Sequence, residues 1–256
     1  MEEELERAIR QRLVAELRDS IHAIMTSTLM ISPLVQREGG SQEILSLNSM
    51  TRSLYSLLRT AQHLDLLEDL RDPNDPGERR MVDLGDLLTD LCRQIEDLTS
   101  DLGCTFRWRG DVEEMVIMGD TYLLSVAVLN LVTNAVQAVR TRKDTQGLIS
   151  FQWKRQKSTC QITIRDNGPG LEGFTPWQGT GIGLQVARRC LESHGGTLML
   201  DSSPTGVTAV ITLPLANPEE GEKLLLTDRT SGFSPLLTEF APYLSPGYFA
   251  KINQYS

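Results

Sequence analysis

The sequence predicts an α+β protein in which an N-terminal antiparallel helical hairpin precedes a two-layer α/β sandwich. Apolar residues recur every three or four positions through the first 70 residues, which is the period of an amphipathic helix. The segment "RDPNDPGERR" ends this pattern with prolines, a glycine and several charges. Strand and helix patterns alternate beyond it, as in a sandwich. We therefore expect a hairpin over residues 1–71, a sandwich over residues 80–216 and an extension of unassigned role over residues 217–256.

The hairpin is expected to contain two long helices joined by a glycine turn. The first covers residues 2–36, where Pro33 should kink or end it, and Gly39 and Gly40 suit the turn that follows. The second runs from Gln42 to Leu70. Their expected apolar faces are Leu5, Ile9, Leu13, Leu17, Ile21 and Ile24 in the first helix, and Ile44, Leu47, Leu54, Leu58, Ala61 and Leu64 in the second. Because a lone hairpin buries little apolar surface, we expect a homodimer that forms a four-helix bundle.

The sandwich is expected to mix short strands with three longer helices. Its strands show period-two alternation or short apolar runs, and its helices show a period of three to four. In order, the expected elements are a strand and a helix over 81–103, strands over 104–110 and 114–120, a helix over 121–142, strands over 148–156 and 158–168, a helix over 181–196, and a closing β-hairpin over 197–215.

Composition argues against several classes of function. The net charge of −9 argues against a nucleic-acid or anionic-membrane surface, because both need a basic patch. No stretch reaches 18 consecutive apolar residues, so we expect no membrane span in this chain. The charged start, "MEEELERAIRQR", differs from a signal peptide. The four scattered cysteines are expected to be reduced core residues of a cytoplasmic protein, and the three scattered histidines indicate no structural metal site.

The motif "NLVTNA" places two amide side chains four residues apart in an apolar helix. Asn130 and Asn134 therefore share one helix face. Two amides in such surroundings need hydrogen-bond partners, so one interpretation is a pair bonded to neighbouring loops. The other is a set of oxygen ligands for Mg²⁺ beside the phosphates of a nucleotide.

Two glycine clusters follow in "DNGPG" and "GTGIGL". Asp166 stands at the end of a strand, where it either caps the turn or accepts a hydrogen bond from the exocyclic amine of a base. The second cluster opens a helix, whose N–H groups and dipole favour an anion. No "GK[ST]" follows, which excludes a P-loop, and the glycines come too late in the chain for a Rossmann unit.

The three motifs in this order resemble the N, G1 and G2 boxes of the ATP-binding domain shared by gyrase, Hsp90, histidine kinases and MutL. The resemblance covers about residues 80–215 and is closest to sensor histidine kinases of the nitrogen-regulation type, through "NAVQA". It implies that the chain binds ATP with Mg²⁺. It further implies that Asn134 binds the Mg²⁺ with Asn130 nearby, that Asp166 holds the adenine amine, that Gly168 and Gly170 shape the adenine pocket, and that the phosphates are lined by Gly179, Thr180, Gly181 and Gly183.

The resemblance also assigns a phosphoryl acceptor. Gyrase-like ATPases carry a catalytic glutamate where this chain has Asn130, which cannot act as a general base, so a kinase is favoured over an ATPase. In histidine kinases the acceptor is a histidine on the first hairpin helix, which corresponds to His22; the alternative is an ordinary exposed helical histidine. His63 is a weaker candidate. Thr26, one turn after His22, matches the residue that positions water for dephosphorylation of a partner.

Two departures from the family pattern leave a second function open. The family places an acid directly after the histidine and a proline five positions after it, where this chain has Ala23 and Ser27; Asp19 is a candidate to replace the acid. The lid between Gly170 and Gly179 has only eight residues, and we interpret Phe174 and Trp177 as the remnant of the family's Phe-rich segment.

The predicted function is a two-component histidine kinase that autophosphorylates His22 and passes the phosphate to an aspartate of a response-regulator receiver domain. The alternative is a kinase-poor phosphatase, phosphotransfer protein or scaffold. A third reading is an anti-sigma type serine kinase, which the N-terminal hairpin disfavours because those kinases lack one.

Overall fold

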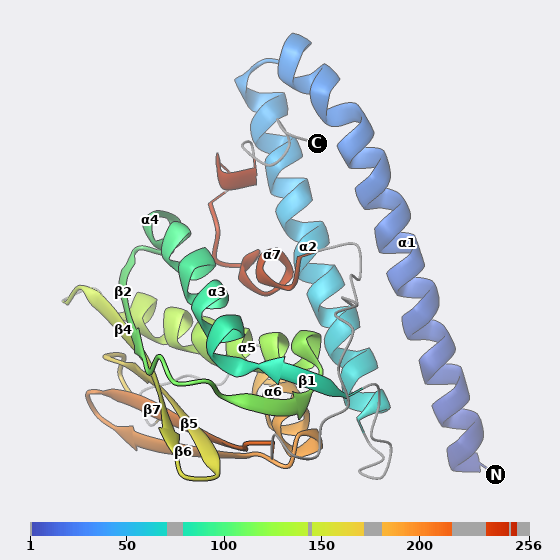
Figure 1. Cartoon of the computed structure of the whole chain (residues 1–256). Helices are drawn as coiled ribbons and strands as arrows, with labels where there is room; N and C mark the ends of the chain where they lie inside the picture. Colours follow the sequence, from blue (N-terminus) through green and yellow to red (C-terminus); the bar gives the residue numbers. More distant parts are fainter. Residues whose placement is uncertain are drawn as a thin grey trace. The chain divides into compact units, whose positions relative to one another are not determined.

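The protein is described here from a computed structural model, shown in Figure 1, which covers residues 2–70, 79–142, 145–171, 181–216, 234–245 and 247–249. The chain divides into two compact units. One contains Met1–Asp69 together with Leu237–Ser256, and the other contains Leu70–Leu236. The predicted fold class is confirmed: a helical hairpin precedes an α/β sandwich.

The hairpin consists of α1 (Glu2–Glu38) and α2 (Ser41–Asp69). The turn falls at the two glycines as predicted, and the Gly39 N–H donates to the Val35 carbonyl over 2.8 Å. Pro33 does not end the helix, because α1 continues to Glu38. Pro33 lies on an exposed side of α1, where water can bond the carbonyl that proline leaves without a donor.

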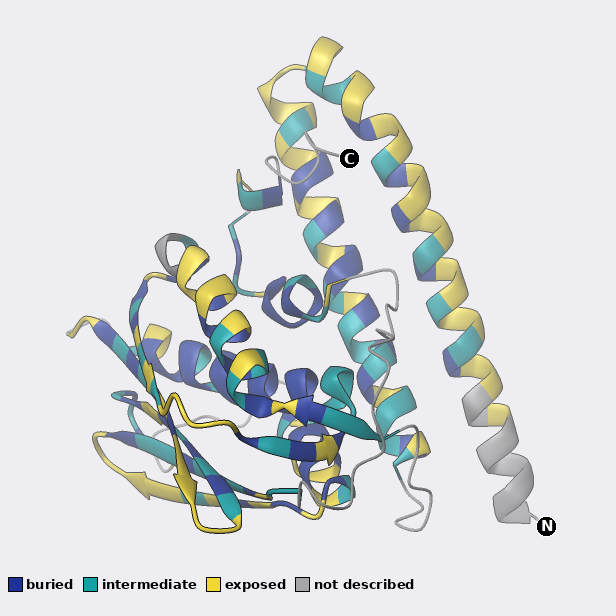
Figure 2. Ribbon diagram, viewed as in Figure 1, coloured by how far each residue is buried: buried dark blue, intermediate teal, exposed yellow. Residues whose placement is uncertain are grey.

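The apolar face predicted for α1 is only partly buried within the single chain. Ile21 is buried, but Ile9, Leu13, Leu17 and Ile24 are 46–60% exposed; the side chain of Leu5 lies outside the described residues. The residues that α1 buries are Val14, Ile21, Met25, Thr28 and Ser32. In α2, four predicted residues (Leu47, Leu54, Leu58 and Ala61) are buried, whereas Ile44 is half-buried and Leu64 is 37% exposed. Figure 2 shows the exposed stretches along α1. The period marks a wide apolar stripe, and one neighbouring helix covers only part of it.

The end of the chain packs with the hairpin. Helix α7 (Pro235–Phe240) carries Glu239, whose carboxylate contacts Arg59 Nε and His63 Nε2 of α2, each at 2.7 Å. Farther along, the rings of Phe249 and Tyr55 lie 5.8 Å apart. The segment buries three large apolar side chains, which are Phe240, Leu244 and Phe249. Residues 237–245 and 247–249 are therefore a structural part of the hairpin unit, which the sequence pattern had left without an assignment.

The sandwich contains a five-stranded sheet with helices on one face (Figure 1). The strand order is β2-β4-β5-β7-β6, in which β2 and β4 are parallel and the other neighbours are antiparallel. Strands β1 and β3 form a separate antiparallel pair. The bounds of these elements are β1 Arg80–Asp83, α3 Leu84–Asp97, α4 Thr99–Leu102, β2 Cys104–Gly110, β3 Val116–Gly119, α5 Thr121–Thr141, β4 Gly147–Gln156, β5 Thr159–Asp166, α6 Ile182–Ser193, β6 Thr197–Ser203 and β7 Gly206–Pro214.

Helix α5 forms the centre of the sandwich core. It is long and apolar enough to pass a length-and-composition test for a membrane span, the one such helix among the described residues, but 78% of the apolar window is buried within the fold. Its N-terminus is capped by Asp120, whose Oδ1 accepts from the N–H groups of Tyr122 and Leu123. Burial on this scale is the pattern of a core helix.

The four cysteines are buried and unpaired, as predicted. Burial raises the pKa of the Cys160 thiol to about 12, with the nearby Asp111 carboxylate adding to the shift. Burial likewise raises the pKa of Cys92 and Cys104. Their thiols are therefore protonated and inert in the folded protein. No group of three or more metal-ligating side chains occurs in the part of the chain that the structure describes.

Candidate nucleotide site

Asp166 is the last residue of β5 and lies 6% exposed at the end of the sheet. Its Oδ1 accepts from the N–H of Gly168 at 2.8 Å and from the N–H of Val207 at 3.3 Å. Burial raises the pKa of Asp166, while these backbone hydrogen bonds and the charge of Arg165 act in the opposite direction. The carboxylate is therefore fixed at a partly desolvated position, where a further N–H donor would find a strong acceptor.

The turn after Asp166 depends on glycine at two positions. A Cβ on Gly168 would lie 2.8 Å from the Cβ of Ala138, so this turn rests directly on α5. Gly170 has φ +75°, and a Cβ there would overlap the carbonyl oxygen of Ser203 at the end of β6. Side chains are excluded at both positions, so the backbone itself lines the space beside Asp166.

Asn167 and Gly206 also shape this turn, and the sequence reasoning assigned neither of them. The side chain of Asn167 accepts from Leu148 N at 2.7 Å and donates to Gln146 O at 3.0 Å, which ties the turn to β4. Gly206 has φ +141°, and a Cβ there would overlap the Asp166 carbonyl. The only available signal for Gly206 was a "PTG" turn between two strands.

The two asparagines of α5 occupy different environments. Asn130 is fully buried, and its Nδ2 donates to Val126 O of the same helix at 2.9 Å. Asn134 is half-buried. It stands one turn before Ala138, the residue that contacts the Gly168 turn, so Asn134 shares the side of α5 that faces Asp166. The fold thus brings Asn134 and Asp166 to one region and keeps Asn130 beneath it.

The second glycine cluster is described only in part. Gly181 is the N-cap of α6, with φ +69° and open space where a Cβ would lie, and Gly183 is buried in the first turn. Gly179 and Thr180 lie outside the described residues, as do Phe174 and Trp177 of the predicted lid.

The predicted phosphoryl acceptor lies on α1 in the hairpin unit. His22 is half-buried, and its Nε2 atom is covered from solvent. Thr26 is exposed one turn away, and its hydroxyl donates to the His22 carbonyl at 2.9 Å. Ala23 and Ser27 are both exposed, as is Asp19. His63, the weaker candidate, is 3% exposed and contacts the Glu239 carboxylate.

His194 is a third histidine with a structural position in the sandwich. It is 6% exposed and bonds through both ring nitrogens: its Nδ1 contacts Cys190 O at 2.6 Å, and its Nε2 accepts from Asp120 N at 2.9 Å. Burial lowers the pKa of His194. A neutral ring with its proton on Nδ1 satisfies both contacts, so His194 holds the residue that caps α5.

A known protein family matches part of the sandwich in sequence. Residues 119–217 match the family described as "Histidine kinase-, DNA gyrase B-, and HSP90-like ATPase". The matched region begins just before α5 and ends just after β7, so it includes both asparagines, the Asp166 turn and the glycines of α6.

Several curated proteins are similar in sequence. The sensory histidine kinase/phosphatase NtrB of Vibrio alginolyticus is 29% identical over 209 residues, which are 72% of this chain and 59% of that protein. Sporulation kinase B of Bacillus subtilis is 36% identical over 117 residues, covering 41% of this chain and 27% of the relative. AtoS of Escherichia coli is 35% identical over 122 residues, covering 43% and 19%. The chain thus spans little more than half the length of NtrB and less of the other two.

Solved structures share the fold. Full-length ShkA, solved in complex with AMPPNP, gives a TM-score of 0.61 at 17% identity and covers 80% of this chain and 46% of ShkA. The histidine kinase AdeS of Acinetobacter baumannii gives a TM-score of 0.53 at 16% identity, covering 78% of this chain and 97% of AdeS. At these identities the likeness concerns the fold, which includes the hairpin as well as the sandwich.

Proposed function

We propose that this chain, which has a histidine kinase core, is an ATP-dependent protein-histidine kinase. In sequence order its helical hairpin is followed by a sandwich that matches the histidine kinase-, DNA gyrase B-, and HSP90-like ATPase family. The chain would transfer the γ-phosphoryl group of ATP to His22 and then to an aspartate of a response-regulator receiver domain. The observation that carries the proposal is the Asp166 turn, in which a buried carboxylate and bare backbone lie against the Asn134 side of α5.

The adenine end of ATP is proposed to bind at Asp166. Both backbone donors engage Oδ1, so we expect Oδ2 to accept from the adenine amine. Gly168 and Gly170 leave room for the base because neither position tolerates a side chain. ShkA, which shares this fold, was solved with an ATP analogue bound, which supports nucleotide binding by such a sandwich.

The phosphate end is proposed to lie between Asn134 and the start of α6. The half-exposed amide of Asn134 fits Mg²⁺, which prefers a few oxygen ligands and keeps several waters. When bound, Mg²⁺ would neutralise phosphate charge. Gly181 and Gly183 at the N-terminus of α6 offer backbone N–H groups and the positive end of the helix dipole, and Gly179 and Thr180 complete the proposed set. Buried Asn130 would support Asn134 from within the helix and not touch the nucleotide.

His22 is proposed to accept the phosphoryl group through a ring nitrogen. Imidazole has a free lone pair near neutral pH. The Nε2 atom is covered, so attack through this nitrogen would require the ring to turn. Thr26 lies one turn along the same side of α1, and its exposed hydroxyl oxygen retains a lone pair for a water molecule. This pairing suits removal of phosphate from a receiver as well as its transfer.

The hairpin is proposed to form a homodimer through two exposed heptad stripes. Leu17, Ile24 and Ile31 are spaced by seven on α1 and are 46–49% exposed; Met50, Leu57 and Leu64 repeat the spacing on α2 and are 37–50% exposed. Apolar residues with this repeat form the seams of helical bundles.

The second candidate is a phosphatase-biased or phosphotransfer protein on the same fold. It is favoured by Ala23, which leaves no acid directly after His22, and by the retained Thr26. The name of the NtrB relative includes both kinase and phosphatase.

The test is incubation with γ-³²P-ATP and Mg²⁺ of the wild type, His22→Ala and Asp166→Asn. The kinase proposal expects acid-labile, alkali-stable label that both substitutions abolish, with nucleotide binding lost only in Asp166→Asn. Nucleotide binding without any label would favour the second candidate, and loss of phosphate from a labelled receiver in the wild type but not in Thr26→Ala would then support it. Acid-stable phosphate on a partner's serine would contradict both.

A further inference from the structure

The outer face of the five-stranded sheet is polar and lies opposite the helices. In β4 the buried residues Ile149, Phe151 and Trp153 alternate with Gln152 and Lys154, which are exposed. The same alternation continues in β5. Helices α3, α5 and α6 cover the inner face (Figure 1). The outer face therefore contributes nothing to the core, and its residues are free to vary with function.

Four cations gather on this outer face. Arg107 and Arg109 lie on β2, Lys154 on β4 and Arg165 on β5, and all four are exposed. Strand register pairs Arg109 with Gln152, and Ser150 with both Arg107 and Arg165. Strands lie about 4.8 Å apart, so Arg107 and Arg165 are about 10 Å from each other across Ser150. Within the described part of the chain, none of these cations forms an ion pair.

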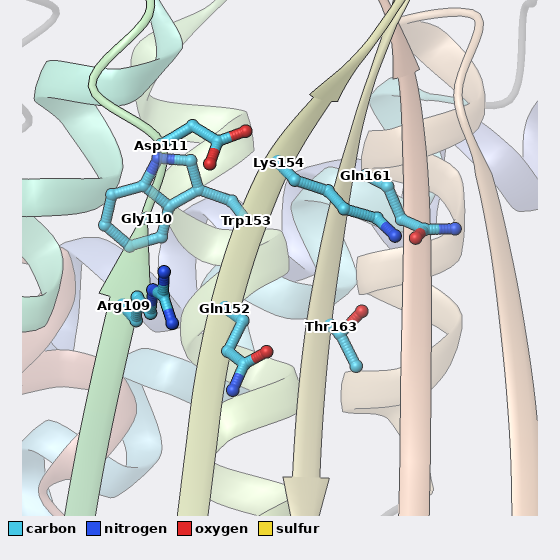
Figure 3. A pocket seen from close by; sticks show the side chains of 8 residues that line it. All are labelled: Arg109, Gly110, Asp111, Gln152, Trp153, Lys154, Gln161 and Thr163. Carbon is cyan, nitrogen blue, oxygen red and sulfur yellow. The ribbon is translucent and has the colours of Figure 1, made fainter.

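A shallow hollow lies between two of these cations (Figure 3). Arg109 borders it on β2 and Lys154 on β4, where the lysine side chain extends toward Gln161. Gln152 lies opposite Arg109, and Thr163 lies opposite Gln152 on β5; both line the hollow and supply neutral donors and acceptors. A surface with cations at its margin and neutral hydrogen-bonding groups at its centre fits carboxylates that arrive from outside.

Two acidic residues, Asp111 and Asp201, lie at the margins of this face. Asp111 borders the hollow, where its carboxylate accepts from the backbone N–H of Arg155 at 2.9 Å. Asp201 is exposed on the edge strand β6, two strands from Arg165. The inner side of the same edge is rigid, because the rings of Trp108 and Trp153 stack 5.9 Å apart. The cations therefore project from a fixed platform.

The positive face contrasts with the charge of the whole chain, which is −9 with 34 acidic and 25 basic residues. The net negative charge should repel acidic proteins from most of the protein's surface, whereas the four cations make the local charge of the outer sheet face positive. We propose that the outer sheet face, defined by Arg107, Arg109, Lys154 and Arg165, is a docking surface for an acidic segment of a partner protein. Arg165 directly precedes Asp166, but the surface is defined by outward-facing side chains of the sheet, and the proposal does not depend on the proposed kinase activity.

The test measures binding of a fluorescein-labelled octaglutamate peptide to the full chain by fluorescence anisotropy. A glycine-serine peptide of equal length is the neutral probe. The wild type is expected to bind octaglutamate, to bind the neutral peptide at least about tenfold more weakly, and to lose affinity as salt rises, because charge complementarity is screened. The double variant Arg109→Glu/Lys154→Glu should weaken octaglutamate binding by about tenfold or more.

The matched control is Arg188→Glu/Arg189→Glu, which makes the same charge change on the exposed side of α6. It should leave octaglutamate binding within about twofold of wild type. Equal weakening by both double variants would overturn the proposal, because net charge alone would then explain it. Absence of octaglutamate binding to the wild type would also overturn it. Saturable competition by millimolar inorganic phosphate at one site would also overturn the proposal, because it would indicate a small-anion pocket. Thermal unfolding of both variants checks that the fold is retained.

Discussion

Removal of the Glu239 carboxylate should detach the end of the chain from the hairpin. Glu239 is 2% exposed, and its two oxygens contact Arg59 Nε and His63 Nε2 at 2.7 Å each. The side chain of Arg59 is 17% exposed and that of His63 is 4% exposed. Glu239→Ala therefore removes a carboxylate that a largely buried guanidinium and a buried imidazole both contact. Loss of one partner from a buried ion pair costs about 3–5 kcal/mol.

Hydrogen exchange on the full chain measures this cost where it acts. At fixed protein concentration, amides of residues 237–249 should exchange at least about a hundredfold faster in Glu239→Ala, since 1.4 kcal/mol corresponds to a factor of ten. Glu239→Gln keeps the shape and one acceptor, so its effect should be smaller. The control is Glu16→Ala, which removes the exposed Arg12–Glu16 pair on α1 and should change exchange little. Unchanged protection of residues 237–249 in Glu239→Ala would refute the reasoning.

The Glu239 contact also predicts how the protection of residues 237–249 from hydrogen exchange changes with pH. Burial alone would raise the pKa of Glu239, but the hydrogen bond and charge of His63 and the charge of Arg59 outweigh it and hold the pKa below its usual value of 4.5. A group whose folded pKa is lowered stabilises fully above its unfolded pKa and loses this contribution as the pH falls through the folded pKa. Protection of residues 237–249 in the wild type should therefore decrease below pH 4.5 more steeply than in Glu239→Gln.

Three other outcomes are expected. Gly170→Ala should destabilise the sandwich and abolish ATP-dependent stabilisation in thermal unfolding, because its Cβ would overlap the Ser203 carbonyl. Gly181→Ala has open space for its Cβ and should cost only the ~1–2 kcal/mol of a left-handed backbone. Equal effects of the two substitutions would contradict this. Leu57→Glu should convert the proposed dimer to a monomer by light scattering, while Val112→Glu, at a fully exposed site, should not. The four buried cysteines should resist a thiol-reactive disulfide reagent at pH 8 until the protein is unfolded, and fast reaction of the native protein would count against their burial.

Elements of the sandwich could be predicted from the sequence because their signals are local. The alternation of Cys160, Ile162 and Ile164 marked β5, and the glycines at 195 and 196 marked the end of α6. Turn chemistry also located Asp166 at a strand end beside a glycine turn. These signals depend on side-chain period and backbone freedom, which neighbouring residues determine.

Features that depend on distant contacts could not be predicted in the same way. Equal spacing suggested that Asn130 and Asn134 face the same ligand, but the packing around α5 buries Asn130 completely and leaves Asn134 half-buried. Gly206 acts on Asp166 across 40 residues of sequence, through a close approach of two backbones. Docking of Glu239 on His63 spans 176 residues. No period or motif encodes such pairs.

Near the level of His22, different residues of α2 pack in the hairpin core and contact the end of the chain. The Arg18–Asp65 pair, at 2.7 Å, lies across the hairpin, and in this antiparallel register His22 is at the level of Ala61. Near that level, Leu58 and Ala61 are buried in the hairpin core, while Arg59 and His63 contact Glu239.

From Leu54 to His63 the one exposed residue is Leu57, and the others are buried or half-buried. Leu57 belongs to the heptad stripe proposed for dimerisation. If that stripe closes a dimer, α2 retains no exposed residue at the level of the acceptor histidine. A receiver domain would then have to approach His22 chiefly along α1, where Asp19, Ala23, Thr26 and Ser27 are exposed. Substitutions at Thr26 and Ser27 should therefore affect phosphotransfer to the receiver more than labelling of His22.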